Sequence, residues 1–161
     1  MANLTLIMDT RERKEATVLI MKEFEKQNVI VIRSKLWVGD YQLLENPMLT
    51  IDRKKSLQEL CSNVVQDHKR FCAELQRAKD VGIHVIVLVE HSKNIRTLDD
   101  VRHWVNPRLK VSPLAVSGER LYKILFAISK HYDTEFVFCE KKDTGKRIIE
   151  ILTEGVRNET V

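Results

Sequence analysis

Short apolar runs alternate along the chain with segments whose apolar residues recur at helical spacing. Apolar and β-branched runs bounded by turn-forming residues are typical of strands. Apolar residues three and four positions apart instead line one side of an amphipathic helix. The first pattern predicts strands at residues 4–8, 29–33, 41–44, 49–53, 83–90 and 136–139. The second predicts helices at residues 14–27, 67–80, 119–131 and 145–153, a helix that begins near residue 56, and a short helix at 98–104.

Local signals mark several ends of these elements. Ser56 and Glu59 have the spacing of a capping box, in which each side chain satisfies an exposed amide at the start of a helix. Thr144 stands where it can cap the last predicted helix. Residues 45–47 (Glu-Asn-Pro) form a turn sequence between two strands, which predicts a hairpin with a three-residue loop.

The order of the elements indicates the fold class. Strands and helices alternate along the whole chain except at the hairpin, and residues 83–90 are nearly all apolar, as in a strand buried on both faces. We therefore expect an α/β fold in which helices flank a mixed central sheet. The length of 161 residues suits one domain, so residues 1–161 are expected to form it without a second one.

The hairpin brings together the residues with the clearest chemical potential. If residues 45–47 form its loop, the numbers of paired residues sum to 92, and Asp40 lies directly opposite Asp52. Directly paired residues hold their Cβ atoms about 5 Å apart, so the two carboxylates can share one hard cation. Lys54 lies two residues beyond Asp52 and emerges on the same face. A register slip of one residue would put the two acids on opposite faces.

Two carboxylates and a lysine on one face suit the hydrolysis of a phosphodiester. A divalent ion held by carboxylates polarises the phosphoryl oxygen and lowers the pKa of its bound water. A nearby ammonium stabilises the charge that develops in the transition state. Asp9 and Glu12, just past the first strand, can extend this set. The alternative is that Asp40 is a turn residue and that Asp52 and Lys54 lie on an exposed strand.

Composition narrows the class of protein. The formal charge of +4 permits a polyanionic partner, and basic residues gather at 11–14, 53–55, 69–70 and 141–146. The cysteines, three in number, include no CxxC pair, so reduced thiols are expected rather than a zinc site or disulfides. No apolar run approaches the roughly 20 residues of a membrane span, and the first residues lack a signal-peptide pattern. We therefore expect a cytoplasmic or DNA-associated protein that is neither secreted nor bound to a membrane.

Three motifs in order resemble the signature of the XPF-type nuclease domain, which the Hef nuclease shares. They are Asp9-Thr-Arg-Glu12, Val38-Gly-Asp-Tyr41 and Ile51-Asp-Arg-Lys54. Residues 70–75, 86–90 and 144–146 also resemble the later helix, the core strand and the last helix of that domain, so the likeness covers nearly the whole chain. The resemblance implies the restriction-endonuclease-like fold, a PD-(D/E)xK metal site, and cleavage of branched or flapped DNA in repair or recombination.

The resemblance also implies a role for each matching residue. The predicted catalytic set is Asp9, Glu12, Asp40, Asp52 and Lys54. Within it, Asp9, Asp40 and Asp52 are expected to bind Mg²⁺, for which Mn²⁺ can substitute, or to support its ligands closely. The predicted DNA contacts are Arg11, Arg13, Arg53, Lys55 and Arg70. Of the residues within the motifs, Arg11, Glu12 and Arg53 are expected either to position the site or to contact phosphate. Domains of this type pair through their late helices, which implies a homodimer through residues 121–128 and 148–152, and no helix-hairpin-helix module is expected here.

Two departures from the family pattern keep other functions open. Asp52 stands where the family has a glutamate, and Gln58 stands where it usually has an aspartate. These changes favour, as an alternative, a catalytically weak or inactive DNA-binding or scaffold protein with the nuclease fold. The motifs do not specify the DNA structure either, so processing of simple ends or single strands stays open beside cleavage at junctions.

Overall fold

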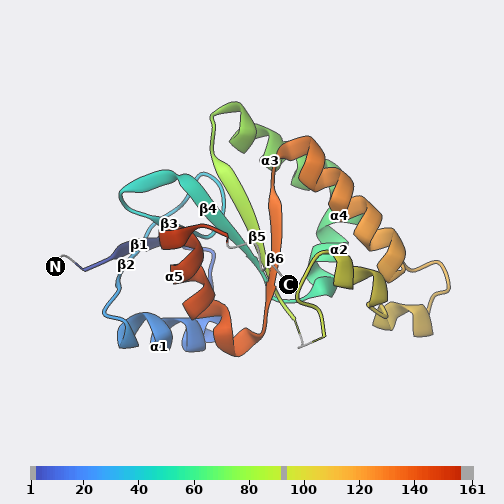
Figure 1. The fold of residues 1–161 in the computed structure, drawn as a ribbon, viewed down its shortest axis with the longest axis horizontal. Coiled ribbons are helices and arrows are strands. Elements are labelled where there is room, and N and C mark those ends of the chain that lie inside the picture. The colour runs from blue at the N-terminus through green and yellow to red at the C-terminus, as the bar shows by residue number, and fades with distance from the viewer. Residues whose placement is uncertain (1–2, 92–93, 157–161) are drawn as a thin grey trace.

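A single mixed sheet of six strands, in the order β2-β1-β3-β4-β5-β6, runs through the molecule (Figure 1). The computed structural model describes residues 3–91 and 94–156. Strand β3 is antiparallel to β1 and to β4, and the other neighbouring pairs are parallel. The strands are β1 (Thr5–Met8), β2 (Ile30–Arg33), β3 (Tyr41–Leu43), β4 (Asn46–Lys54), β5 (His84–Glu90) and β6 (Glu135–Cys139).

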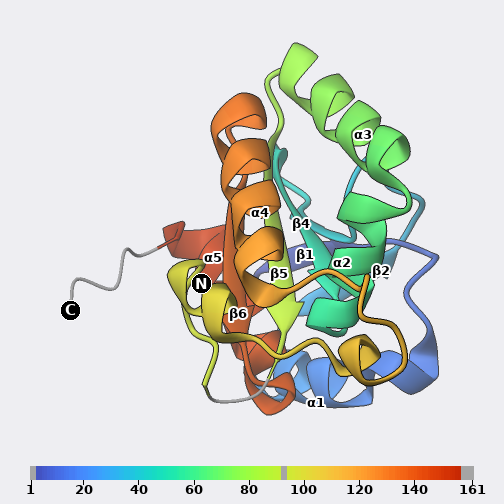
Figure 2. The ribbon, with the colours of Figure 1, turned by 90° about the vertical axis from the view of Figure 1, so that its right-hand side faces the viewer.

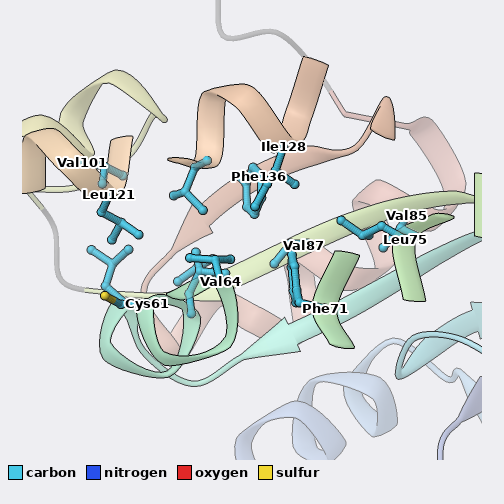
Figure 3. Close-up of a cluster of buried hydrophobic side chains, with 14 of the residues drawn as sticks. Cys61, Val64, Phe71, Leu75, Val85, Val87, Val101, Leu121, Ile128 and Phe136 are labelled. Carbon is cyan, nitrogen blue, oxygen red and sulfur yellow. The ribbon is translucent and has the colours of Figure 1, made fainter. Parts of the chain in front are cut away.

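Helices cover both faces of the sheet, as Figures 1 and 2 show. They are α1 (Val18–Lys26), α2 (Leu57–Val65), α3 (His68–Asp80), α4 (Gly118–Tyr132) and α5 (Thr144–Glu154). Helices α1 and α5 pack on one face, around a core that includes Phe24, Ile51 and Ile148. Helices α2, α3 and α4 pack on the other face, around the core drawn in Figure 3. The predicted α/β architecture, a mixed sheet flanked by helices, is thus confirmed.

The residues of β4 and β5 divide between these two cores because side chains alternate along a strand. Ile51, Ile86 and Leu88 belong to the core beside α1 and α5, whereas Val87 and Val89 belong to the core beside α2 to α4. Strand β5 is therefore buried on both faces, as its apolar run predicts.

The predicted hairpin has the correct strand pairing at Tyr41, away from the turn, but the turn itself is wrong. Strand β3 ends at Leu43 and β4 begins at Asn46, so the turn has two residues and Leu43 pairs with Asn46. A bulge then shifts the register, and Tyr41 pairs with Ile51, the pairing that the three-residue loop would give. Pro47 lies within this irregular stretch, where its missing N–H breaks no ladder hydrogen bond.

Helix ends also differ in part from the prediction. The side chain of Ser56 accepts a hydrogen bond from the main-chain N–H of Glu59 over 3.0 Å, so the predicted cap of α2 is confirmed. Thr144 is not a cap: it is the first residue of α5 and has helical dihedrals, because the short helical turn Lys141–Asp143 leads directly into the helix. The predicted helix at 14–27 likewise begins as a tighter turn, Lys14–Thr17.

The apolar stripes of the late helices are used within the chain. Leu121, Leu125 and Ile128 of α4 are buried in the core of Figure 3. Ile148 and Leu152 of α5 are buried in the core on the opposite face. These five side chains therefore do not supply an exposed apolar surface to a partner, because the sheet already covers them.

Candidate active site

Asp52 and Lys54 share the face of the sheet that α2 and α3 cover. Along β4 they alternate with Ile51 and Arg53, which point to the opposite face. The Nζ atom of Lys54 lies 3.2 Å from Oδ2 of Asp52, and only 13% of the lysine side chain is exposed. The same Nζ atom lies 5.7 Å from the centre of the Phe71 ring of α3. The ammonium is thus held between a carboxylate and an aromatic face.

Asp40 joins this pair from the residue just before β3. Its main-chain N–H donates to the carbonyl of Ile51 over 2.7 Å, and its Oδ2 accepts from the main-chain N–H of Arg53 over 2.8 Å. These bonds place its carboxyl group against that of Asp52, close enough for a hydrogen bond between them. The structure therefore brings together the predicted acid, acid and lysine.

A glycine fixes the approach of the chain to this position. Gly39 has a φ of +78°, and a Cβ atom there would lie 2.1 Å from Oγ1 of Thr50. Only glycine tolerates both the left-handed dihedral and so close a neighbour. The Thr50 hydroxyl in turn donates to the carbonyl of Val38 over 3.1 Å. The glycine of the Gly-Asp motif thus places Asp40 against β4.

The charges of the site favour a bound cation. Burial raises the pKa of Asp40 well above its usual range, and the negative charges of Asp52 and Glu12 raise it further. Burial lowers the pKa of Lys54, but the charge of Asp52, its hydrogen bond to the lysine and the charges of Asp40 and Glu59 together outweigh burial, so the pKa of the lysine is raised overall. Lys54 accordingly stays an ammonium at neutral pH, and a second positive charge is needed to keep both carboxylates ionised.

A buried network lies on the other face of β4. The Arg53 Nε atom donates to Glu12 over 2.7 Å and its Nη1 atom to Glu90 over 2.9 Å, and the Tyr41 hydroxyl donates to Glu12 over 2.7 Å. Burial works to lower the pKa of Arg53, but its contacts with Glu12 raise it, so the guanidinium stays charged. The three ionic side chains are at most 10% exposed. This network fixes the strand that carries Asp52 and Lys54.

The structure places Arg53, one of the predicted DNA contacts, inside this buried network. Its side chain is 7% exposed, and Glu12 and Glu90 use its donors, so the guanidinium is not available to a phosphate. Sequence reasoning missed Glu90 and Tyr41 as partners of this network. The signal for Glu90 was a single charge at the end of an otherwise apolar strand, because a buried charge requires a partner.

Asp9 anchors a loop instead of joining the other two aspartates. Its Oδ1 atom accepts from the main-chain N–H of Leu36 over 2.7 Å, and its Oδ2 atom accepts from Nε of Arg11 over 2.7 Å. Burial works to raise the pKa of Asp9, but these hydrogen bonds outweigh it and lower the pKa. Both oxygens therefore already have partners, and they fix the segment that leads from β2 to Asp40.

The carboxylate groups of the site suit magnesium. Within residues 3–91 and 94–156, no group of three or more His, Cys, Asp or Glu side chains is placed to hold a metal ion. Asp40 and Asp52 offer two carboxylates side by side. Mg²⁺ is often bound by one or two carboxylates and otherwise keeps waters or takes substrate phosphate oxygens. The pair therefore fits a magnesium ion that binds together with a phosphodiester.

A polar hollow of about 140 Å³ adjoins Lys54. Its lining residues are Lys54, Asn63, Asp67, Arg70, Phe71 and Glu74, from β4, α2, the turn after it, and α3. The Oδ1 atom of Asn63 is buried and, among the described residues, has no hydrogen-bond partner. Of the other residues predicted to contact DNA, Arg11, Arg13, Lys55 and Arg70 are exposed. Arg70 lines this hollow, and Arg11 lies close enough to Asp40 for their charges to interact, so these two arginines form a basic rim beside the acidic pair.

The mixed sheet, together with two acids and a lysine on adjoining strands, defines a domain of the restriction-endonuclease-like class. Residues 8–152 match the model of the ERCC4 domain, and the chain belongs to this family, that of the XPF-type nuclease domain. A comparison with curated proteins gives no significant match.

Two solved structures of XPF from Aeropyrum pernix have a similar fold. One is 20% identical with a TM-score of 0.61, and the alignment covers 96% of this chain and 62% of that one. The other, in complex with DNA, is 20% identical with a TM-score of 0.65, covering 93% of this chain and 64% of that one. The chain thus spans less than two thirds of the length of these relatives. None of the helices in its described part is both long and apolar enough to cross a bilayer.

Proposed function

We propose that the chain is a divalent-metal-dependent endonuclease that hydrolyses phosphodiester bonds in DNA. The observation that carries the proposal is the pair of adjacent carboxyl groups, Asp40 and Asp52, with the ammonium of Lys54 3.2 Å from one of them. Membership of the ERCC4 domain family and the fold shared with a DNA-bound XPF support the same reading.

Each residue has a part that its surroundings explain. Asp40 and Asp52 would hold Mg²⁺ or Mn²⁺, which when bound supplies an activated water and polarises the phosphoryl oxygen. Lys54, charged at neutral pH, stabilises the negative charge that gathers on the phosphoryl oxygens as water attacks phosphorus and the bond to the leaving oxygen breaks. Glu12 acts through Arg53 as a positioning residue. Asp9 supports the loop that carries Asp40 rather than binding the metal.

DNA with a branch, a flap or a junction is the substrate we propose, on the strength of the family resemblance. Arg11, Arg13, Lys55 and Arg70 are exposed and carry the charge that phosphates require. Arg70 also lines the hollow beside Lys54, which gives it the most direct approach to a phosphate bound at the site.

The test is cleavage of fork, flap, junction and linear DNA in magnesium, in manganese and in EDTA. We expect cleavage with either metal, none in EDTA, and loss of cleavage in the variant Lys54→Ala. The matched control is Lys26→Ala, which removes an exposed lysine from α1, on the opposite face of the sheet from Asp52 and Lys54. If no substrate is cut with either metal, the proposal fails; if Lys54→Ala cuts normally, the proposed site is wrong.

A DNA-binding protein that keeps the fold without cleaving is the second candidate. It is favoured by the small acidic set, because Asp52 is shorter than the family's glutamate and the described residues provide no third ligand side chain beside it. This candidate predicts that the wild-type protein binds branched DNA in the same assays but never cuts it. Restored cleavage in Asp52→Glu would attribute the loss to the missing methylene.

We also propose a homodimer that forms through the side of α4 that is not buried in the core. Phe126 is 44% exposed and stacks on Tyr122, with their ring centres 5.9 Å apart. Exposed aromatic pairs are common anchors at protein interfaces. Light scattering should report a dimer for the wild-type protein and a monomer for Phe126→Ser. A monomeric wild-type protein would refute this part of the proposal.

A further inference from the structure

Trp37 is the most unusual side chain near the candidate site, because 58% of it is exposed to solvent. Tryptophan is on average a highly buried residue, and its large apolar ring gains most when another surface covers it. Trp37 lies in the segment between β2 and β3, three positions before Asp40. The Cα atoms of these two residues are thus at most about 11 Å apart.

The residues on both sides of Trp37 are tied down. Leu36 is 6% exposed, and its main-chain N–H donates to Oδ1 of Asp9 over 2.7 Å. Val38 is 5% exposed, and its carbonyl accepts from the hydroxyl of Thr50 over 3.1 Å. The backbone that carries Trp37 is therefore fixed from two sides while its ring stays outside. A ligand that covers this ring has little loop disorder to overcome, because the loop is already ordered.

The surroundings of Trp37 suit a nucleic acid. Lys35, two positions earlier, is exposed and can approach a phosphate. Aromatic rings bind unpaired bases by stacking, and they do so for any sequence because every base has a flat π-face. Bases inside a duplex are already stacked on their neighbours and offer no such face.

We propose that Trp37 is a stacking platform for an unpaired nucleobase that lies beside the phosphodiester held at Asp40 and Asp52. The inference rests on the proposed function, since it takes DNA as the ligand. A stacking site at Trp37 would make the chain prefer DNA in which single-stranded and duplex parts meet. The phosphates of the duplex would lie on the basic rim, and the first unpaired base would cover Trp37.

The test uses tryptophan fluorescence, for which the chain is well suited because its only other tryptophan is Trp104. Trp104 is partly buried against the core, so Trp104→Phe leaves Trp37 as the single reporter. In EDTA, where no cleavage can interfere, a short oligodeoxythymidine should quench this signal and a blunt duplex of equal length should not. Equal quenching by both ligands, or by neither, would overturn the proposal.

Affinity supplies the second readout. Trp37→Ala should weaken binding of the single strand by roughly 5- to 150-fold, the range expected for one stacked base, and Trp37→Phe should retain part of the affinity. Binding of the blunt duplex should stay unchanged in both variants. Leu44→Ala is the control, because it removes a similarly exposed apolar side chain (53%) from the turn between β3 and β4, and it should leave single-strand binding as it is.

These outcomes separate the inference from the proposed function. If the wild-type protein cuts no DNA but Trp37 discriminates single strands as described, the nuclease proposal fails and the stacking site stands. If the protein cuts DNA and Trp37→Ala binds single strand and duplex as the wild type does, the stacking site is wrong and the nuclease proposal is untouched.

Discussion

Replacing Arg53 with methionine removes the positive charge that lies between two buried carboxylates while keeping most of the side-chain length. Arg53 contacts Glu12 at 2.7 and 3.3 Å and Glu90 at 2.9 Å. The exposed fractions of the three side chains are 7%, 10% and 4%, so water cannot replace the lost donors. Two carboxylates would then face each other in the interior without compensation.

The expected cost follows from this geometry. Breaking a buried ion pair by removing one partner destabilises a protein by about 3–5 kcal/mol, because the remaining charge is buried unpaired. Arg53 has two such partners, so the upper part of that range applies. With a urea m-value of about 2 kcal/mol/M, the unfolding midpoint should fall by about 2 M.

Urea unfolding of Arg53→Met beside the wild-type protein measures this cost. The control is Lys142→Met, which breaks the exposed pair between Lys142 and Glu140 and should shift the midpoint little. The triple variant that also carries Glu12→Gln and Glu90→Gln should regain part of the loss, since no charge is then left unpaired. A midpoint for Arg53→Met equal to that of the control would refute the idea that the network holds β4 in place.

Further predictions concern the site itself. Gly39→Ala should lower the free energy of unfolding by about 1–3 kcal/mol or more, because it combines a left-handed φ with a clash at Thr50; an unchanged urea midpoint would contradict this. The pKa of Asp40 is raised above 3.8 in the fold, so stability in EDTA should fall as pH rises through the folded value. Melting curves of Asp40→Asn should lack this fall, and parallel pH profiles for variant and wild type would count against it. Lys54→Ala should slow single-turnover cleavage at least about 100-fold, whereas a rate within a few-fold of wild type would rule out its role in the transition state.

Local sequence patterns predict most of the strands and helices of the fold. Apolar and β-branched runs located the strands, helical spacing located the helices, and the apolar run of β5 indicated its burial on both faces. The hairpin shows the limit. Turn residues alone suggested a loop that includes Pro47, but the chain turns earlier and recovers the same register at Tyr41 through a bulge. Two deviations that cancel cannot be read from local sequence.

The arrangement of the candidate site could likewise be predicted from the sequence only in part. Asp40, Asp52 and Lys54 could be placed together because one short hairpin joins them. The contacts of Asp9 with Leu36, and of Arg53 with Glu90, join residues 27 and 37 positions apart, so no local spacing encodes them. For this reason the sequence left open whether Asp9 binds the metal or supports its ligands, and whether Arg53 contacts DNA or positions the site.

Cleavage of labelled branched DNA by wild type and Asp52→Asn, each measured across a magnesium titration, tests the central claim most directly. The exchange keeps the size of the side chain and removes the charge that faces Asp40 and Lys54, and melting curves report whether each protein is folded. The wild-type protein should cut DNA in proportion to bound magnesium, and Asp52→Asn should not cut at any concentration. Cleavage by the wild type in EDTA, or equal magnesium-dependent cleavage by the folded variant, would contradict a metal site at Asp40 and Asp52.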